Sequence, residues 1–560
     1  MIPVRWFAAA FASLALMAAA AAPTTLTVRP VMAEGRFAAM DVAVSFQGDA
    51  DGDTTLKLPD AWGGETALWR ALSDVRAEGA AVEAGAGPAL RRLRHPPGAR
   101  ITVRYRVRDL TGERGDKAGA DYRPLIRPGH FQLLGNAVVA LPEGARMRDP
   151  ARFRMEGAPA GMTFASDLEH ARPGGLTVAD LVESILVGGD YRVLDAGGGL
   201  RVAIRGAWPR DDAGWRAQIA RIGAVQRDYW GAGPEPFLVT LSPVSAPPET
   251  LSIGGTGRGD AFAVFATANA PPARLDRLLA HEMMHTWISA RVGGLDDADE
   301  QLGYWLSEGF TDWAAFRTSV RGALWTPEQF AEAFNESLTA YDRSTVRTAP
   351  NARILAEFWS SEEVQRLPYR RGLLLATLWD AQVRAASGGR HDLDDVLLAM
   401  QRAAARRGDV SARQIFPVVM RRFGVDVGVA LTTLVGEGAP VDLPAAVFAP
   451  CGMIEARVER IWERGFDFEA TRRADWVIAG VREGSSAWRA GLRNGMRLRQ
   501  WSETAGDRVP DRPMTAGVTD GGVARAITWL PAGEEARAVR RLVLDPAMDR
   551  AACVRRLSGL

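Results

Sequence analysis

The chain has 560 residues, of which 47% are hydrophobic and 24% are charged. This composition is typical of a globular protein and excludes a disordered one, and the length is enough for three or four ordinary domains. The 68 basic residues nearly balance the 67 acidic residues, so charge gives no reason to expect nucleic acid or an anionic membrane surface as a partner.

The N-terminal segment, residues 1–22, has the features of a signal peptide. Arg5 precedes an apolar run from Trp6 to Ala22 that ends in small residues, as signal peptidase requires. We expect cleavage and a periplasmic or secreted protein, with an uncleaved membrane anchor as the alternative. No later stretch is long and apolar enough to cross a bilayer, so no stable membrane insertion is expected after cleavage.

Residues 23–160 are predicted to form a β-rich domain with a sandwich-like architecture. In this region apolar Ile101, Val103, Tyr105 and Val107 alternate with polar residues, which is the period of a strand with one buried face. Turns rich in glycine and proline separate this run from similar ones. The whole chain is therefore expected to be a multi-domain α+β protein.

Residues 161–445 are predicted to hold a small sheet followed by a helical bundle. Strands are expected in "GLRVAIRGAW", "EPFLVTLSPV" and "DAFAVFAT", and a helix that ends at Gly231 precedes the second of them. From Pro272 to about Gly424 the pattern is mostly helical. One helix should begin at a capping box in which Thr326 is the N-cap and Gln329 closes the box.

Residues 446–560 are predicted to form a third, mixed segment behind a linker rich in proline and glycine, "EGAPVDLPAAVFAPCG". The chain has two cysteines, Cys451 and Cys553. A disulfide and two buried free thiols are both open, because a secreted protein permits the bond without requiring it. Their spacing excludes a CxxC metal knuckle.

The stretch "LLAHEMMHTWISARVGG" contains the pattern most indicative of chemistry. His281 and His285 lie four residues apart, so a helix would place both imidazoles on one face within reach of a single ion. Glu282 is one residue further round the helix and can accept a proton from metal-bound water. The alternative is an amphipathic helix that contains histidine by chance, expected in well under roughly 1% of such chains.

A third ligand is predicted in "YWLSEGFTDW". Glu308 would complete two histidines and one carboxylate, an open tetrahedral zinc site suited to catalysis, with Ser307 as the cap of a new helix. Asp312 lies four residues later on the same helical face, where it can accept the outer N–H of a liganding histidine. The alternatives are a solvated surface acid for Glu308 and a salt-bridge partner for Asp312.

Tyr369, in "LPYRRGLLLATLW", is expected just before a helix. A tyrosine hydroxyl aimed at a metal can donate a hydrogen bond to the oxyanion formed when water attacks a carbonyl. Buried structural tyrosines are far commoner, so this residue alone would indicate nothing.

Together these motifs resemble the gluzincin metallopeptidases, and more narrowly the glycyl aminopeptidase family. The matching blocks are "HEMMHTW" at 281–287, "WLSEGFTDW" at 305–313 and "PYRRG" at 368–372. The resemblance implies a β-rich N-terminal domain, a thermolysin-like catalytic domain over residues 161–445 and a PDZ domain over residues 446–560.

The same resemblance implies the roles of the motif residues. His281, His285 and Glu308 would bind one Zn²⁺, Glu282 would be the general base, and Tyr369 would donate to the transition state. The implied activity is hydrolysis of a peptide or protein substrate.

The C-terminal stretch "WVIAGVREGSSAWRAGLRNGMRLRQW" resembles the core of a PDZ domain. The preceding "RGFDFEA" resembles its carboxylate-binding loop, with Gly465, Phe466, Asp467 and Phe468. Such a loop would capture a peptide C-terminus beside an open strand edge. The alternative is a β-rich domain with glycine turns.

One departure from the family concerns the glycine-rich strand that carries an amine-binding glutamate in gluzincin aminopeptidases. The comparable stretch, "LSIGGTGRGDAFAVFAT", contains Gly254 and Gly255 but no glutamate, and Asp260 is its one acid. We therefore predict a secreted zinc peptidase and favour an aminopeptidase, whose substrate backbone pairs with the "DAFAVFAT" strand. A zinc endopeptidase and a non-catalytic peptide-binding protein are the alternatives.

Overall fold

The computed structural model describes residues 22–111, 122–170, 174–233, 235–244, 251–257, 260–288, 290–295, 299–407, 410–502 and 509–560. Within the described residues, the chain forms two compact units that meet in sequence between Tyr191 and Arg192. The predicted signal segment, apart from Ala22, lies outside the described residues. None of the described helices combines the length and the hydrophobicity that a membrane crossing needs.

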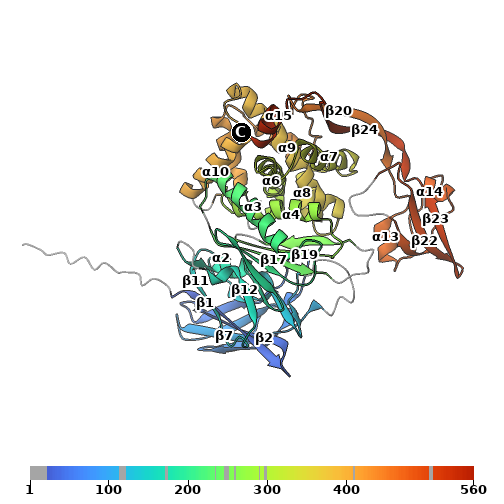
Figure 1. Cartoon of the computed structure of the whole chain (residues 1–560). Helices are drawn as coiled ribbons and strands as arrows, with labels where there is room; N and C mark the ends of the chain where they lie inside the picture. The colour runs from blue at the N-terminus through green and yellow to red at the C-terminus, as the bar shows by residue number, and fades with distance from the viewer. Residues whose placement is uncertain are drawn as a thin grey trace, which may run out of the picture. The chain divides into compact units, whose positions relative to one another are not determined.

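The first unit is built almost entirely of strands (Figure 1). Its three sheets have the orders β13-β11-β1-β2-β7-β4, β10-β3-β6-β5 and β12-β14-β9-β8. The strands are β1 Thr24–Ala33, β2 Arg36–Gln47, β3 Asp53–Lys57, β4 Leu72–Glu78, β5 Ala81–Ala84, β6 Leu90–Arg94, β7 Arg100–Val107, β8 Leu125–Arg127, β9 His130–Leu134, β10 Leu141–Pro142, β11 Pro150–Met155, β12 Thr163–Ser166, β13 Leu176–Thr177 and β14 Ile185–Gly189, with short helices α1 Gly135–Val138 and α2 Val178–Glu183.

The alternation predicted in β7 is present: Ile101, Val103, Tyr105 and Val107 are all buried. The unit runs to Tyr191, beyond the boundary predicted at residue 160. The reason is that β14 pairs with both β12 and β9, which ties the following residues to this unit.

The second unit begins with a five-stranded sheet of order β15-β16-β17-β19-β18. Strands β16, β17 and β19 are parallel, and the two outer strands run antiparallel to them. Helices α3 and α4 lie next to this sheet (Figure 1). Their apolar side chains form one buried cluster with it. The strands are β15 Arg192–Gly197, β16 Leu200–Ile204, β17 Phe237–Pro243, β18 Ile253–Thr256 and β19 Ala261–Ala266.

The position of β19 corrects one prediction. This strand is the predicted "DAFAVFAT" element, and both of its edges are hydrogen-bonded, to β17 on one side and to β18 on the other. A peptide therefore cannot add to it. The strand beside it, β18, is the last in the order of the described sheet.

A helical region follows the sheet, as predicted. Helix α3 ends at Gly231 in the left-handed conformation, and Thr326 and Gln329 form the expected capping box of α7. The helices are α3 Asp212–Trp230, α4 Pro272–Ile288, α5 Tyr304–Ser307, α6 Gly309–Arg321, α7 Pro327–Arg343, α8 Asn351–Glu357, α9 Glu362–Ser387, α10 Leu393–Arg407, α11 Ala412–Arg422 and α12 Gly428–Ala430.

Helix α9 begins earlier than the sequence indicated. Tyr369 lies inside this 26-residue helix and not before it, because Ser361 caps the helix by accepting from the Val364 N–H. Pro368 therefore lies within the helix. A proline there removes a single backbone donor, and the buried apolar side chains on either side of it stabilise the helix against that loss.

The predicted linker at the end of the bundle is packed and not free. Val441, Leu443, Val447 and Phe448 are buried in the same apolar cluster as the bundle helices. A disulfide joins Cys451 to Cys553 in helix α15, Arg550–Ser558. The pairing that the sequence left open therefore ties the end of the chain to the beginning of this C-terminal segment.

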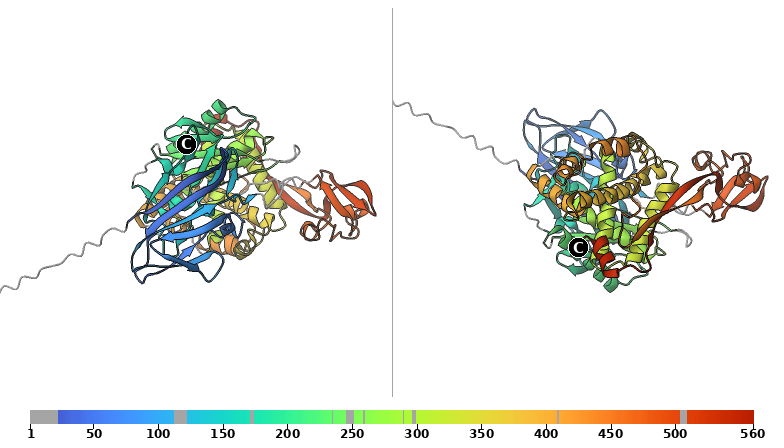
Figure 2. Two further views of the ribbon diagram at one scale, coloured as in Figure 1. Left: turned by 90° about the horizontal axis from the view of Figure 1, so that it is seen from below. Right: turned by 90° about the horizontal axis from the view of Figure 1, so that it is seen from above.

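A two-stranded ribbon of β20, Gly452–Trp462, and β24, Ala532–Leu544, leads away from the disulfide (Figure 2). The Asn335 side chain in α7 anchors it: its amide donates to the Leu542 carbonyl at 2.8 Å and its oxygen accepts from the Leu542 N–H. The ends of the predicted third domain therefore pack on the bundle.

The residues between the two ribbon strands form a small lobe with its own apolar core. The start of the stretch that resembles a PDZ core pairs only through the isolated bridges Asp467–Ala479 and Val477–Arg497 among the described residues. The elements of the lobe are α13 Phe468–Arg473, α14 Ser486–Arg489, β21 Arg497–Trp501, β22 Met514–Asp520 and β23 Val523–Trp529.

A buried charge network holds α15 and α10 against α6. Arg317 of α6 lies 2.9 Å from Asp392 and 3.0 Å from Asp394, and Arg556 of α15 donates to Asp380 at 2.9 Å. Burial raises the pKa of Asp394 to about 7, even though the Arg317 charge acts to lower it. The Asp394 carboxylate therefore depends on the Arg317 guanidinium for its charge balance.

Replacing Arg317 with Met is expected to lower the free energy of unfolding by about 3–5 kcal/mol, because it leaves the buried Asp394 without an ion-pair partner among the described residues. Thermal or urea unfolding of the full chain would measure the loss. Arg402→Met, on the exposed face of α10, is the matched control and should change stability little. Equal stability of the two variants would contradict a structural role for the network.

Candidate metal centre

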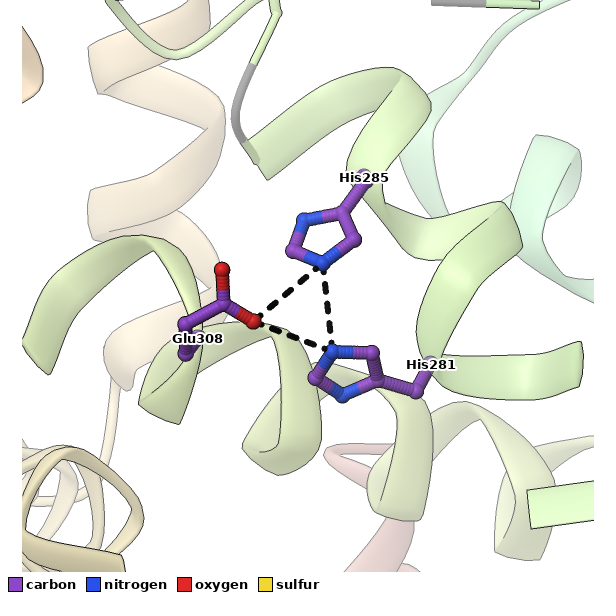
Figure 3. A group of neighbouring side chains, drawn as sticks. All are labelled: His281, His285 and Glu308. Carbon is purple, nitrogen blue, oxygen red and sulfur yellow. Dashed lines mark hydrogen bonds and ion pairs between the residues drawn. The ribbon is translucent and has the colours of Figure 1, made fainter. Parts of the chain in front are cut away.

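Helix α4 carries both histidines and is held by its opposite face. Leu275, Leu279 and Met283 are buried against the sheet, which turns His281 and His285 toward the bundle. His281 is 6% exposed, and the imidazole rings are 4.8 Å apart and nearly perpendicular, so both Nε2 atoms point to one place (Figure 3).

Glu308 reaches the same place from the junction of α5 and α6. Its Oε2 lies 3.3 Å from His281 Nε2 and 3.4 Å from His285 Nε2, and the two Nε2 atoms are 3.1 Å apart (Figure 3). Glu308 itself has helical backbone angles, so α5 and α6 form one nearly continuous helix through it. Ser307 is therefore the last residue of α5 and does not cap a new helix, contrary to the prediction.

The geometry of these three atoms fits a tetrahedral zinc ion. Ligand bonds of about 2.0–2.1 Å place neighbouring tetrahedral ligand atoms about 3.3–3.4 Å apart, close to the separations observed here. Two imidazole nitrogens and a carboxylate oxygen are also the donor types that zinc prefers. Among the described residues, these three form the one group of histidine, cysteine or acidic side chains that could hold a metal ion.

Two glycines allow the helices to come close enough for this convergence. Gly309 follows Glu308, and Gly372 lies one turn after Tyr369 in α9. A Cβ on Gly372 would lie 1.9 Å from the Trp305 carbonyl oxygen, and a Cβ on Gly309 would lie 2.2 Å from Gly372 Cα. The crossing of α6 and α9 is therefore a backbone-to-backbone contact that excludes any side chain.

Both histidines are oriented by groups on α6. Asp312 lies where it was predicted, with Oδ1 2.9 Å from His281 Nδ1. Burial acts to lower the pKa of His281, but Asp312 and Glu308 outweigh it and raise the pKa well above its usual range. With Nδ1–H donating to Asp312, Nε2 is left facing the shared point.

The equivalent partner of His285 was missed by the sequence reasoning. Thr311 Oγ1 lies 3.4 Å from His285 Nδ1 and itself donates to the Ser307 carbonyl at 2.5 Å. Thr311 is three residues after Glu308, so the helical period that suggested Asp312 could also have indicated it.

Glu282 and Tyr369 flank the three ligand atoms. Burial raises the pKa of Glu282, while the two histidines act to lower it; a raised pKa suits a general base. The Tyr369 ring stacks on His281 at a centroid distance of 5.8 Å. Burial and the charges of Glu308 and Glu282 raise the pKa of Tyr369, so its hydroxyl keeps its proton and can donate.

Other predicted residues are held in structural contacts. Gly254 and Gly255 lie in the edge strand β18, and a Cβ on Gly255 would lie 2.2 Å from the Phe262 ring, so packing on β19 requires glycine there. Asp260 lies 3.6 Å from Arg291 and lines a small cavity to which no metal-centre residue contributes.

The predicted carboxylate-binding loop in the lobe is partly occupied by the protein itself. Gly465 has a φ of +89°, Phe466 is buried in the lobe core, and the Asp467 N–H donates to the Ala479 carbonyl at 2.9 Å. Phe468 begins helix α13, so the open strand edge expected next to this loop is absent from the described lobe.

No family model matches the sequence, and no curated protein matches it either. The structure is similar to that of an aminopeptidase N family protein from Idiomarina loihiensis, with a TM-score of 0.68, 14% identity, and coverage of 95% of this chain and 100% of that one. The chain has the fold of that protein.

Two further solved structures show a lower similarity. An M1 zinc metallopeptidase from Deinococcus radiodurans has a TM-score of 0.45 and 18% identity, with coverage of 76% of this chain and 96% of that one. Yeast LTA4 hydrolase in complex with bestatin has a TM-score of 0.48 and 14% identity, with coverage of 77% of this chain and 70% of that one.

Proposed function

We propose that this protein is a zinc-dependent peptidase that hydrolyses peptide bonds. The convergence of His281, His285 and Glu308 at tetrahedral ligand spacing carries the proposal. Glu282 and Tyr369 beside them supply a base and a hydrogen-bond donor, which a purely structural zinc site does not need. The fold shared with an aminopeptidase N family protein supports the same assignment.

The side chains suggest how the reaction proceeds. Bound zinc would supply Lewis-acid chemistry, activating a water and polarising the substrate carbonyl. Glu282 takes the proton of the attacking water and passes it to the leaving amine. The Tyr369 hydroxyl donates a hydrogen bond to the oxyanion, while Asp312 and Thr311 keep the two imidazoles in the correct orientation.

The substrate backbone would run alongside β18, the outermost strand of the described sheet. This edge strand contains Gly254 and Gly255 and lies beside β19, and an extended peptide pairs with such an edge through main-chain hydrogen bonds. The proposed pairing partner of the substrate is therefore β18, and not β19 as the sequence suggested.

We favour an aminopeptidase, on the similarity to the aminopeptidase N family protein. The second candidate is an endopeptidase, because "LSIGGTGRGDAFAVFAT" has no glutamate for a free amine and Arg291 lies beside its one acid, Asp260. We also propose that residues 1–22 act as a signal peptide, which directs export of the protein to the periplasm or the exterior.

The small C-terminal lobe is proposed to be a PDZ-like peptide-binding module. Its three-stranded sheet, two short helices and glycine turn at Gly465 support this proposal, although helix α13 replaces the expected strand edge. If the metal centre were inactive, this lobe would make the chain a non-catalytic peptide-binding protein.

Removal of the metal is expected to abolish peptide hydrolysis, and one equivalent of Zn²⁺ should restore it. A peptide library digested by the chelated and the reloaded protein, read by mass spectrometry, tests this; protein incubated with chelator plus excess zinc is the control. Loss of single N-terminal residues would indicate an aminopeptidase and internal cuts an endopeptidase. Hydrolysis by protein that elemental analysis shows to be free of metal would contradict the proposal.

A further inference from the structure

A cavity of about 550 Å³ lies between helices α4, α7 and α9. Its lining includes Arg277, which precedes His281 by one helical turn on the same face of α4, or about 6 Å along the axis. On α9, Arg370 directly follows Tyr369, and Arg366 lies one turn earlier. Two of the helices that line the cavity, α4 and α9, therefore also carry the proposed catalytic groups.

The cavity is lined by charged side chains of both signs, and apart from Arg343 its arginines and its acids are equal in number. Five arginines and four glutamates line it. Arg277 donates to Glu336 at 2.7 Å, whereas Arg343 is bound to Glu459, which does not line the cavity. The lining arginines are Arg274, Arg277, Arg343, Arg366 and Arg370, and the lining acids are Glu332, Glu336, Glu362 and Glu363.

Two of these guanidinium groups have no partner in the described part of the chain. Neither Arg366 nor Arg370 makes an ion pair or hydrogen bond with another described side chain, although Glu362 is near enough to act on the charge of Arg370. Burial and the neighbouring Arg366 lower the pKa of Arg370 to about 10. The half-buried Arg370 remains charged at neutral pH, and no described carboxylate lies within ion-pair distance of it.

We propose that Arg366 and Arg370, in the same cavity as Arg277, form a subsite that binds a carboxylate of the peptide substrate. This inference rests on the proposed peptidase function and adds a substrate class to it. A guanidinium binds a carboxylate by two parallel hydrogen bonds, and here the anion would replace solvent next to a partly desolvated cation. An extended chain spans about 3.3–3.6 Å per residue, so the carboxylate belongs to a residue within two or three of the cleaved bond.

Two sources of this carboxylate are distinguishable: an acidic side chain and the free C-terminus of a short peptide. Binding should be measured to the full chain carrying Glu282→Gln, so that hydrolysis of the probe during the measurement is slowed by about 10²- to 10⁴-fold. The probes are alanine-based pentapeptides: one with a free C-terminus, its C-terminal amide, and amides with Glu or Gln at each position in turn. The carboxylate-bearing peptide is expected to bind about 10- to 100-fold more tightly than its neutral counterpart.

The variants Arg366→Gln and Arg370→Gln, each added to Glu282→Gln, should reduce the ratio of the affinities for charged and neutral peptides toward one. Arg402→Gln, on the exposed face of α10 and outside the cavity, should leave it unchanged. Zinc content is measured for every variant. If Arg370→Gln disturbs the neighbouring Tyr369, the variant of the more exposed Arg366 still tests the subsite.

A preference for the free C-terminus alone would assign the subsite to short peptides, and a preference for Glu over Gln would assign it to acidic residues. Equal binding of charged and neutral peptides, or a preference that survives both arginine substitutions, would overturn the inference. Failure of the proposed function would show separately, as no hydrolysis of any peptide by the wild-type protein.

Discussion

Glutamine in place of Glu282 is expected to lower the rate of peptide hydrolysis by about 10²- to 10⁴-fold, the usual contribution of a general base. The substitution keeps the shape of the side chain and removes the group that accepts the proton of the attacking water. Because Glu282 is not among the three converging ligand atoms, the bound zinc should remain at one per chain. The measurements are kcat/KM on a peptide substrate and the zinc content of the same sample.

The matched control is Glu455→Gln, the same change at an exposed position on β20. It should leave both activity and zinc content unchanged. If Glu282→Gln hydrolysed peptides at the wild-type rate, the proposed base would be wrong. If Glu282→Gln lost its zinc, the loss of activity would reflect the loss of the metal. Glu282 would then have to be reassigned as a zinc ligand.

Alanine in place of Gly372 is expected to weaken zinc binding by at least about tenfold and to destabilise the protein by about 1–3 kcal/mol, the range for overpacking a core. The added methyl group would lie 1.9 Å from the Trp305 carbonyl oxygen. Helices α6 and α9 would have to move apart. Glu308 and Tyr369 lie on opposite sides of this crossing, so their separation from the histidines would change.

Zinc affinity by competition with a chromophoric chelator and the melting temperature would measure both effects. Gly309→Ala should behave in the same way, because its Cβ would meet the same crossing from the other side. Gly436→Ala is the control: its Cβ would lie 3.7 Å from the nearest atom, an ordinary contact. Unchanged zinc affinity in both crossing variants would contradict the positioning role of these glycines.

The sequence predicted best where a local pattern decides the structure. The spacing of His281 and His285 depends only on the helical period, and so does that of Glu308 and Asp312. The capping box at Thr326 is equally local, and the structure contains it. The alternation in β7 needed no knowledge of its neighbours either.

Predictions failed where distant segments decide the structure. Both a glycine-rich strand and its neighbour were visible in the sequence, but sheet order makes β18 the edge and β19 an inner strand. The linker at the end of the bundle has the composition of a loop, yet its apolar side chains are buried. Tyr369 was expected just before a helix, whereas packing of the surrounding residues keeps it, and Pro368 before it, inside α9.

By itself the sequence determined which side chains are available to hold a metal and which pairs share a face of a helix, because helical spacing is set by the backbone alone. Only the tertiary structure decided that Glu308 and Tyr369 meet the two histidines, since this depends on the glycine contact between α6 and α9. It also brought arginines of α4, α7 and α9 around one cavity. Such convergence arises from the packing of separate helices, and no spacing along the chain encodes it.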